Sequence, residues 1–201
     1  MADMNENKRN TEEKKEGSPA LTGRLLESRC IVLSSEINQE VAHSTISQLL
    51  VLAHESNDNI RVFISSQGGH VDSGFAIHDV MRLIKPRVIT VALGWVASMG
   101  VPIFLGGEKG YRYCLPHARF MLHQPSQGVL GQASDIEIEA KEILRIRERI
   151  NQLISKATNQ PMDRVEKDSD RNFWMSAEQA LEYGLVDKII EMDSDMSAKT
   201  K

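Results

Sequence analysis

Ser98 is the residue whose type and position best suit nucleophilic chemistry. It lies within twenty consecutive uncharged residues, 88–107, with the sequence VITVALGWVASMGVPIFLGG. The apolar, largely β-branched run 88–93 predicts a strand buried on both faces, and Gly94 is expected to end it. The small and apolar residues from position 97 predict a helix, so Ser98 is expected at a strand-to-helix turn. Helix N-termini help to stabilise oxyanions, although serine is also a common N-cap residue.

The same uncharged stretch is long enough to span a membrane. Its four glycines, together with Pro102, Thr90 and Ser98, argue against a span, and no other part of the sequence has a membrane-like composition. A buried strand, turn and helix is therefore the preferred interpretation, and no membrane partner is expected.

A serine nucleophile requires a general base, a group that orients the base, and an oxyanion site. Position 96 is valine, so the G-x-S-x-G motif of α/β-hydrolases is absent. The histidines that could serve as the base are His43, His54, His70, His78, His117 and His123. Those at 43, 54 and 78 fall in predicted helices and are more typical of surface or packing residues. His123 ends a predicted buried strand just before a loop and is the preferred candidate, but spacing alone leaves the others open.

Two paired glycines, Gly68 and Gly69, follow the predicted strand 60–64 within the segment SSQGGHVDSG. Glycine lets the backbone approach a substrate carbonyl closely, so these N–H groups could contribute to an oxyanion site. An ordinary tight turn explains the same pair equally well.

Strands and helices are predicted to alternate along most of the chain. Strands are expected at 30–33, 60–64, 88–93, 111–115, 119–122 and 173–175, with a final apolar segment at 185–190. Helices are expected at 21–29, at 40–55, before Pro86, after position 97, at 133–157, from Pro161 and from Ser176. The alternation predicts an α/β fold in one domain, 21–193. The polar segments 1–20 and 194–201 are expected to be flexible tails.

The longest predicted helix, 133–157, contains neither glycine nor proline. Its apolar positions recur at intervals of three and four residues, at Ile136, Ala140, Ile143, Ile146, Ile150, Leu153 and Ala157. Such a stripe is either the core face of an amphipathic helix or the contact surface for another subunit.

Composition narrows the class of protein. A length of 201 residues with 41% hydrophobic content suits one well-packed core. The net charge of −4 gives no reason to expect a nucleic-acid partner. Cys30 and Cys114 lie in apolar, strand-like segments and are expected to be core residues of a reducing compartment rather than a disulfide or zinc ligands. Residues 1–20 contain no apolar leader segment, so a cytoplasmic location is expected.

Four segments occur together in this chain: SSQGGHVDSG, GWVASMG, MLHQPSQGVLGQASDIEIEAKEIL and DRNFWMSAEQALEYGLVDKI. In this order they resemble the ClpP family, the proteolytic subunits of the Clp protease, over residues 22 to 190. The resemblance implies a ClpP/crotonase-like spiral of βα units with a protruding handle helix. It also implies a serine peptidase built as two stacked seven-membered rings. Unfolded polypeptides would be threaded in by an AAA+ ATPase of the Clp kind, and no metal or cofactor is implied.

The resemblance also implies roles for individual residues. Ser98 corresponds to the nucleophile and His123 to the general base, while the N–H groups of Gly68 and Met99 correspond to the oxyanion donors. Contacts between the rings are implied for Gln132 and Asp135 at the start of the long helix, and for the pair Asp170 and Arg171.

Several departures from the family pattern stand out. Asn172 follows the Asp170–Arg171 pair where the family has the triad aspartate, and in another serine-protease fold such an exchange lowers turnover about 10⁴-fold. Gln67 replaces a proline before the paired glycines, and Arg61 interrupts an aromatic surface on which the ATPase docks. The N-terminal tail also differs from the family's pore-loop pattern. The chain is therefore interpreted as a divergent paralogue.

Three functions follow from these observations. The first is a serine endopeptidase subunit, whose intrinsic activity Asn172 lowers. The second is a weakly active or inactive ring subunit that regulates an active ClpP paralogue by assembling with it. The third is an acyl-CoA enzyme of the crotonase type, which shares the fold class but does not require Ser98 and His123.

Overall fold

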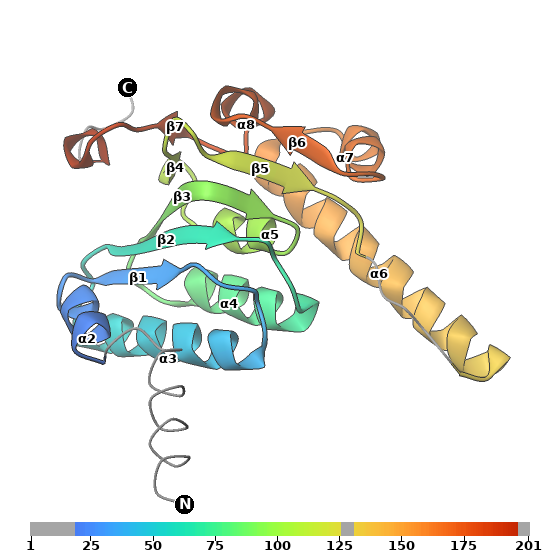
Figure 1. Ribbon diagram of the computed structural model, residues 1–201, viewed down its shortest axis with the longest axis horizontal. Coiled ribbons are helices and arrows are strands. Elements are labelled where there is room, and N and C mark those ends of the chain that lie inside the picture. Colours follow the sequence, from blue (N-terminus) through green and yellow to red (C-terminus); the bar gives the residue numbers. More distant parts are fainter. Residues whose placement is uncertain (1–18, 126–130, 197–201) are drawn as a thin grey trace, which may run out of the picture.

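The computed structural model describes residues 19–125 and 131–196 and shows alternating strands and helices around one sheet (Figure 1). The strands are β1 (Cys30–Leu33), β2 (Ile60–Ser66), β3 (Val88–Ala97), β4 (Arg112–Cys114), β5 (Arg119–Leu122), β6 (Phe173–Met175) and β7 (Lys188–Ile189). The helices are α2 (Pro19–Glu27), α3 (Gln39–Glu55), α4 (Val71–Leu83), α5 (Gly100–Leu105), α6 (Ala133–Thr158), α7 (Met162–Asp168) and α8 (Ala177–Tyr183), followed by the 3₁₀ turn η1 (Asp193–Met196). The predicted α/β fold class is confirmed.

The sheet is parallel along the order β1-β2-β3-β4-β7, while β5 pairs with β3 and, in antiparallel orientation, with β6. Helices α3, α4 and α5 lie on one side of it (Figure 1). Apolar residues of these helices, such as Leu49, Ile77 and Phe104, are buried against strand residues that include Val62 and Val96. Burial of this apolar surface is the main force that holds the layers together.

Strand β3 runs through Gly94, so the prediction that this glycine ends the strand is wrong. The first part of β3 pairs with β4 through Thr90–Ala92, whereas its last part pairs with β5 through Trp95–Ala97. Gly94 lies between the two pairings with a φ of 51°, and the register with β2 is irregular at the same level. A glycine inside a strand often marks such a bend, and here it lets one strand change neighbours.

The uncharged stretch 88–107 forms β3 and the six-residue helix α5, and α5 is buried throughout. This finding overturns the membrane-span alternative for that stretch. Over residues 19–125 and 131–196, the structure contains no helix of sufficient length and apolar character to cross a membrane.

Helix α6 combines both interpretations of its apolar stripe. Its second half packs on the domain, where Asn151, Ile154 and Thr158 are buried. Its first half projects away from the body (Figure 1), and there Ile136 and Ala140 of the stripe are exposed, Ile136 to 42%. Within the described residues, the stripe is thus a core face near the domain and an exposed surface further out.

Arg112 links the sheet to α6 and to the segment before β7. It is 2% exposed and forms an ion pair with Asp187 at 3.1 Å. Its guanidinium also donates to the carbonyl of Ala157, with an N–O distance of 3.3 Å. The Asp187 carboxylate accepts two further bonds from the N–H groups of Gly110 and Arg112. The buried charge is therefore fully partnered.

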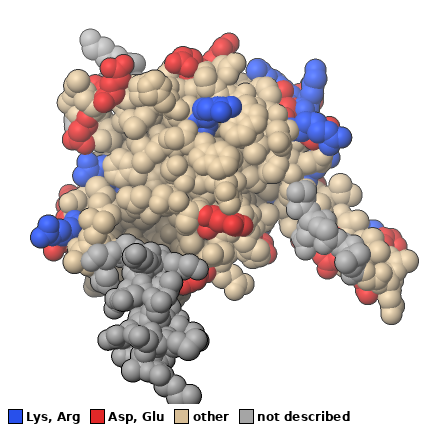
Figure 2. Space-filling view, in the orientation of Figure 1, with Lys and Arg blue, Asp and Glu red and all other residues tan. Residues whose placement is uncertain are grey.

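Most of the two predicted tails lie outside the described residues, as do residues 126–130 of the loop expected after His123. The expected tail 1–20 overlaps the start of α2, which begins at Pro19. Figure 2 shows the surface in the same orientation, with Lys, Arg, Asp and Glu gathered mainly at its margins and uncharged side chains over most of its centre.

Candidate active site

Ser98 lies between the end of β3 and the start of α5, as predicted. Its φ of 52° is in the left-handed region, which non-glycine residues seldom adopt and which often marks functional sites. The residue that caps α5 is Met99, and no side-chain hydrogen bond caps this helix. The alternative of Ser98 as a structural N-cap is therefore wrong, and its hydroxyl has no part in forming the helix.

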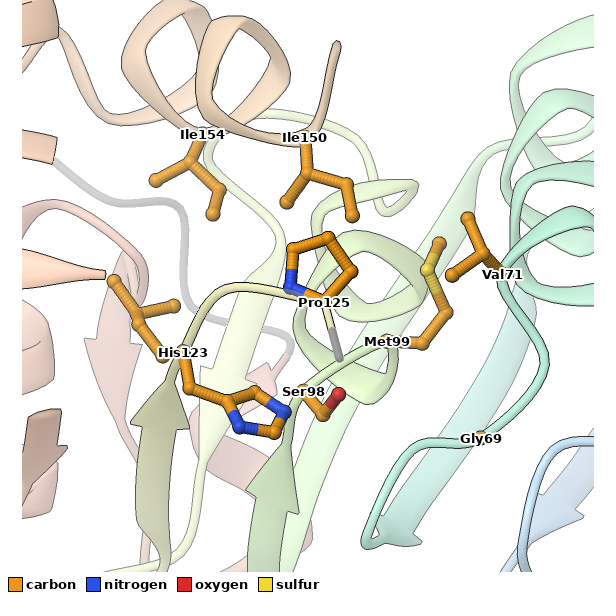
Figure 3. A pocket seen from close by; sticks show the side chains of 9 residues that line it. Gly69, Val71, Ser98, Met99, His123, Pro125, Ile150 and Ile154 are labelled. Atoms are coloured by element: carbon orange, nitrogen blue, oxygen red, sulfur yellow. The ribbon is translucent and has the colours of Figure 1, made fainter. Parts of the chain in front are cut away.

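Ser98 and His123 line one cavity of about 140 Å³. The lining is otherwise mostly apolar and consists of Gly69, Val71, Ser98, Met99, Leu122, His123, Pro125, Ile150 and Ile154. Figure 3 shows the His123 imidazole next to the Ser98 side chain, with Ile150 and Ile154 of α6 across the cavity. The arrangement brings a hydroxyl nucleophile and a base together beside a small apolar pocket.

Strand register explains why these residues meet. The pairing of β3 with β5 ends at Ala97 and Met121, and the N–H of Ser98 donates to the carbonyl of Met121 at 3.0 Å. The antiparallel pairing of β5 with β6 ends at Leu122 and Phe173. His123 and Asn172 are the next residues of these two segments, and opposed residues of antiparallel neighbours lie within side-chain reach.

Ser98, His123 and Asn172 lie near one another, but no hydrogen bonds connect their side chains among the described residues. Among the described residues, no hydrogen bond joins Ser98 to His123 or His123 to Asn172, and Asn172 is exposed. The segments remain side by side beyond the strands, because the Gln124 amide donates to the carbonyl of Asp170 at 2.9 Å. Catalytic hydrogen bonds commonly tighten only when substrate is bound.

The paired glycines lie directly against the nucleophile. A Cβ added at Gly68 would lie 2.7 Å from the Ser98 Cβ and 2.8 Å from the Met99 nitrogen. The Gly68 φ of 94° also favours glycine. The close approach brings the turn at 68–69 up to the first N–H groups of α5.

The N–H of Gly68 is already engaged, because it donates to the Ser66 hydroxyl at 3.1 Å. Gly69 instead lines the cavity. It forms a parallel bridge with Ile37, in which Ile37 bonds to the carbonyl of Gly68 and the N–H of His70. In that pattern the N–H of Gly69 itself points away from Ile37. The geometry favours the N–H of Gly69 as the donor over that of Gly68, which the family resemblance implied. The residues alone had left both glycines open.

The other histidines are placed differently. His70 caps α4, where its Nδ1 accepts from the N–H of Ser73, and His78 contacts Asp79 at 2.9 Å. His43, His54 and His117 are exposed. Among the six histidines, His123 alone lines the Ser98 cavity.

The residues expected at ring contacts lie on α6 and just before β6. Gln132 is the N-cap of α6 and Asp135 lies in its first turn, both exposed. The Asp170 carboxylate pairs with Arg147 of α6 at 3.6 Å. Among the described residues, the Arg171 guanidinium donates to the backbone carbonyl of Asp170. Within one chain, therefore, Arg147 and not Arg171 pairs with the Asp170 carboxylate. The expected contact of Asp170 and Arg171 between rings stays a prediction.

Comparisons with known proteins agree with one family. Residues 13–193 match the family described as Clp protease. The ATP-dependent Clp protease proteolytic subunit 3 of Rhizobium johnstonii is 49% identical over 172 residues, which cover 86% of this chain and 89% of that protein. Its namesake in Rhizobium meliloti is 51% identical over 166 residues, which cover 83% and 85%.

One similar solved structure is a ClpP1 of Listeria monocytogenes in which an asparagine is mutated to aspartate. It matches with a TM-score of 0.82 and 49% identity, covering 88% of this chain and 99% of that one. The chain therefore belongs to the Clp protease family, as a serine peptidase subunit of the ring-forming ClpP type. The family match overturns the acyl-CoA alternative.

Proposed function

We propose that this subunit is an endopeptidase that uses Ser98 as nucleophile, His123 as general base and Asn172 to orient the base. The observation that carries the proposal is the strand register, which places these residues at adjoining ends of β3, β5 and β6. The cavity shared by Ser98 and His123 supports it. The substrates are unfolded polypeptides, which are cleaved to peptides without a metal or cofactor.

In this mechanism His123 takes the Ser98 proton as the hydroxyl oxygen attacks the scissile carbonyl. The N–H groups of Gly69 and Met99 donate to the oxyanion of the tetrahedral intermediate. The intermediate collapses when His123 gives the proton to the leaving amine. Water then hydrolyses the acyl-enzyme by the same steps. Asn172 accepts a hydrogen bond from the imidazole through its amide oxygen, but it supplies no charge to balance the imidazolium.

A second function rests on Asn172 and on the unbonded arrangement of the three side chains. In this alternative the subunit has little activity alone and regulates a ring built with an active ClpP paralogue. Contact with the partner ring would close the hydrogen bonds from Ser98 to His123 and from His123 to Asn172. The sharpest difference between the two functions is the reactivity of Ser98 in the isolated protein.

The proposed assembly is two stacked heptameric rings in the cytoplasm, with a Clp-type AAA+ ATPase as the unfolding partner. The exposed first half of α6, with Gln132 and Asp135 at its start, supports a contact between rings. The exposed residues Asp170, which pairs with Arg147 of α6, and Arg171 are proposed to belong to the same contact. The relatives from Rhizobium carry the description ATP-dependent, which supports an ATPase partner.

The test is labelling of the purified protein with a fluorophosphonate, together with turnover of a short fluorogenic peptide. The protein should be labelled at Ser98, whereas Ser98→Ala should abolish labelling and turnover while the particle size is unchanged. His123→Ala should lower both strongly, and His117→Ala, the control at an exposed histidine, should lower neither.

Turnover that persists in Ser98→Ala would contradict the proposal. Labelling that requires addition of a second ClpP ring would favour the regulatory alternative.

A further inference from the structure

The two tryptophans of the chain, Trp95 of β3 and Trp174 of β6, stack on each other. Their ring centroids lie 6.1 Å apart and their planes differ by 4°. The Arg119 guanidinium of β5 lies over the Trp174 ring, 4.5 Å from its centroid. We call these three residues the tryptophan clamp. Offset stacking and cation–π contacts of this kind are attractive beyond the area they bury.

The clamp joins the same three strands that end at the proposed catalytic residues. Trp95 precedes Ser98 on β3, Arg119 precedes His123 on β5, and Trp174 follows Asn172 on β6. Each clamp residue lies two to four positions along the chain from its catalytic residue. A displacement of one strand relative to the others therefore changes the clamp and the site together.

Strand β6 is the part of the site with the fewest backbone restraints. It has three residues, and among residues 19–125 and 131–196 it pairs with β5 alone. The stack of Trp174 on Trp95 connects β6 directly to β3. The backbone hydrogen bonds of β6 connect it to β5 and not to β3. Met121 of β5, on the same side of the sheet, is only 8% exposed, and its carbonyl holds the Ser98 N–H.

Orientation matters more for Asn172 than it would for an aspartate. A carboxylate attracts an imidazolium through its net charge from a range of angles, whereas an amide acts through a dipole and a directional hydrogen bond. A neutral orienting group therefore gains more from a fixed strand position than a charged one does.

From these observations we propose that Trp95, Trp174 and Arg119 are positioning residues that hold β6, and with it Asn172, in register with His123 and Ser98. This inference rests on the proposed function. None of the three clamp residues is among those that line the Ser98 cavity. We therefore expect the clamp to act on the chemical step rather than on substrate binding.

The test compares Trp174→Leu with the conservative variant Trp174→Phe and with Tyr111→Leu. Tyr111 provides a matched control because Arg87 lies 4.1 Å over its ring in a similar cation–π contact away from the site. We expect Trp174→Leu to lower both kcat for a short peptide and the rate of fluorophosphonate labelling by at least about tenfold, with KM within about twofold. Trp174→Phe should restore most of both rates, and Tyr111→Leu should lower neither.

A double-mutant cycle with Asn172→Ala identifies the route of action. If the clamp acts through Asn172, Trp174→Leu should have no further effect on the labelling rate in the Asn172→Ala background. Additive losses, or a change in KM alone, would overturn the inference. Arg119→Gln removes the cation–π contact without altering either ring, and it should show a smaller loss in the same direction. If Trp174→Leu does not fold, the cycle is run with Arg119→Gln.

Failure of the proposed function has a different signature. In that case Ser98→Ala retains turnover, or fluorophosphonate labels another residue, whatever the clamp variants do. If Ser98 is labelled at the normal rate in every clamp variant, the positioning role of the clamp is contradicted while the proposed function stands.

Discussion

Three contacts hold Ser98 in its left-handed conformation. Its N–H bonds to the carbonyl of Met121, its own carbonyl accepts from the N–H of Val101, and the turn at Gly68 packs against its Cβ. Backbone strain at a functional residue persists only where the surroundings impose it. The position of the nucleophile is thus set by its neighbours, and not by the intrinsic backbone preference of serine.

Gly68→Ala tests this dependence. The new methyl group would lie within 3 Å of the Ser98 Cβ and the Met99 nitrogen. Peptide turnover should fall about 100-fold or more, because small displacements of reacting groups have effects of that size. Gly110→Ala is the control, since Gly110 has a similar φ of 89° but nothing within 4 Å of an added Cβ. Both variants carry backbone strain of about 1–3 kcal/mol, so equal losses of activity would contradict the prediction.

Asn172→Asp should raise the activity of the isolated protein. The new carboxylate stabilises the imidazolium that forms when His123 takes the Ser98 proton, with almost no change in side-chain volume. We expect turnover of a fluorogenic peptide to rise at least about tenfold, which corresponds to about 1.4 kcal/mol of barrier. Asn59→Asp, the same exchange at an exposed position away from the site, should have no effect. Equal, high activity in wild type and variant would show that the amide suffices, and equal, near-zero activity would place the defect elsewhere.

Cys114 should be unreactive in the folded protein. Burial, with a smaller contribution from Glu178, raises the pKa of its thiol to about 12. The thiolate is the reactive form, and below the pKa its fraction rises about tenfold per pH unit. Folded and denatured protein are treated with iodoacetamide at pH 8 and compared by peptide mass spectrometry. In the time needed to modify Cys114 completely in denatured protein, Cys114 of the folded protein should remain unmodified. Rapid modification of Cys114 in folded protein would contradict its burial.

At the residue scale, the sequence predicted best the place of a residue relative to the neighbouring strands and helices. Ser98 at a strand-to-helix turn and His123 at the end of a strand lie where the sequence placed them. The engagement of the Gly68 N–H by Ser66 could not, because it depends on the path of the backbone through the turn. The pairing of Asp170 with Arg147 depends on how α6 docks, which no local pattern reveals.

Among the elements, β3 shows where pattern reading succeeds and fails. Its apolar, β-branched residues predict the strand. Without knowledge of the neighbouring strands, however, Gly94 is predicted to end it. The strand continues because β5 pairs with it beyond the glycine. Strand pairing is a tertiary property, and local propensity gives way to it.

Helix α6 supports a prediction about assembly. Ile136 and Ile143 lie on the outer part of the apolar stripe, and Ile136 is 42% exposed. If the proposed contact between rings forms here, replacing both with Asp would place unpaired charges in it, which is strongly unfavourable. Sedimentation velocity should then show smaller particles of folded protein.

The control for this pair is Ser134→Asp with Gln152→Asp. At 3.6 residues per turn these exposed positions lie on the opposite side of α6. The control should retain the particle size of wild type. An unchanged particle in the Ile136 and Ile143 variant would show that the stripe has no role between subunits.

Across the whole molecule, the Arg112–Asp187 pair connects the sheet, the segment before β7 and α6. Because Arg112 is 2% exposed, removing Asp187 leaves a buried charge without its partner. Asp187→Ala should lower the free energy of unfolding by about 3–5 kcal/mol, measured by urea denaturation. Glu108→Ala, which removes the exposed ion pair with Arg82, should lower it by less than about 1 kcal/mol. Similar losses in both variants would contradict the buried network.

The fold class and most of the helices and strands followed from periodicity in the sequence. The register that gathers Ser98, His123 and Asn172 did not, because it arises from strands that are far apart in the chain. The resemblance to a known family filled this gap by naming the residues, and the structure supplies the physical reason for their proximity.

The stacked tryptophans also give the protein an optical property. Because the chain has no other tryptophan, its intrinsic tryptophan emission comes entirely from the clamp beside the candidate site. Ring–ring contact and a nearby guanidinium both influence indole emission, so a shift of β6 relative to β3 would change the signal. Any such shift on inhibitor binding would therefore be detected beside the candidate site in the unlabelled protein.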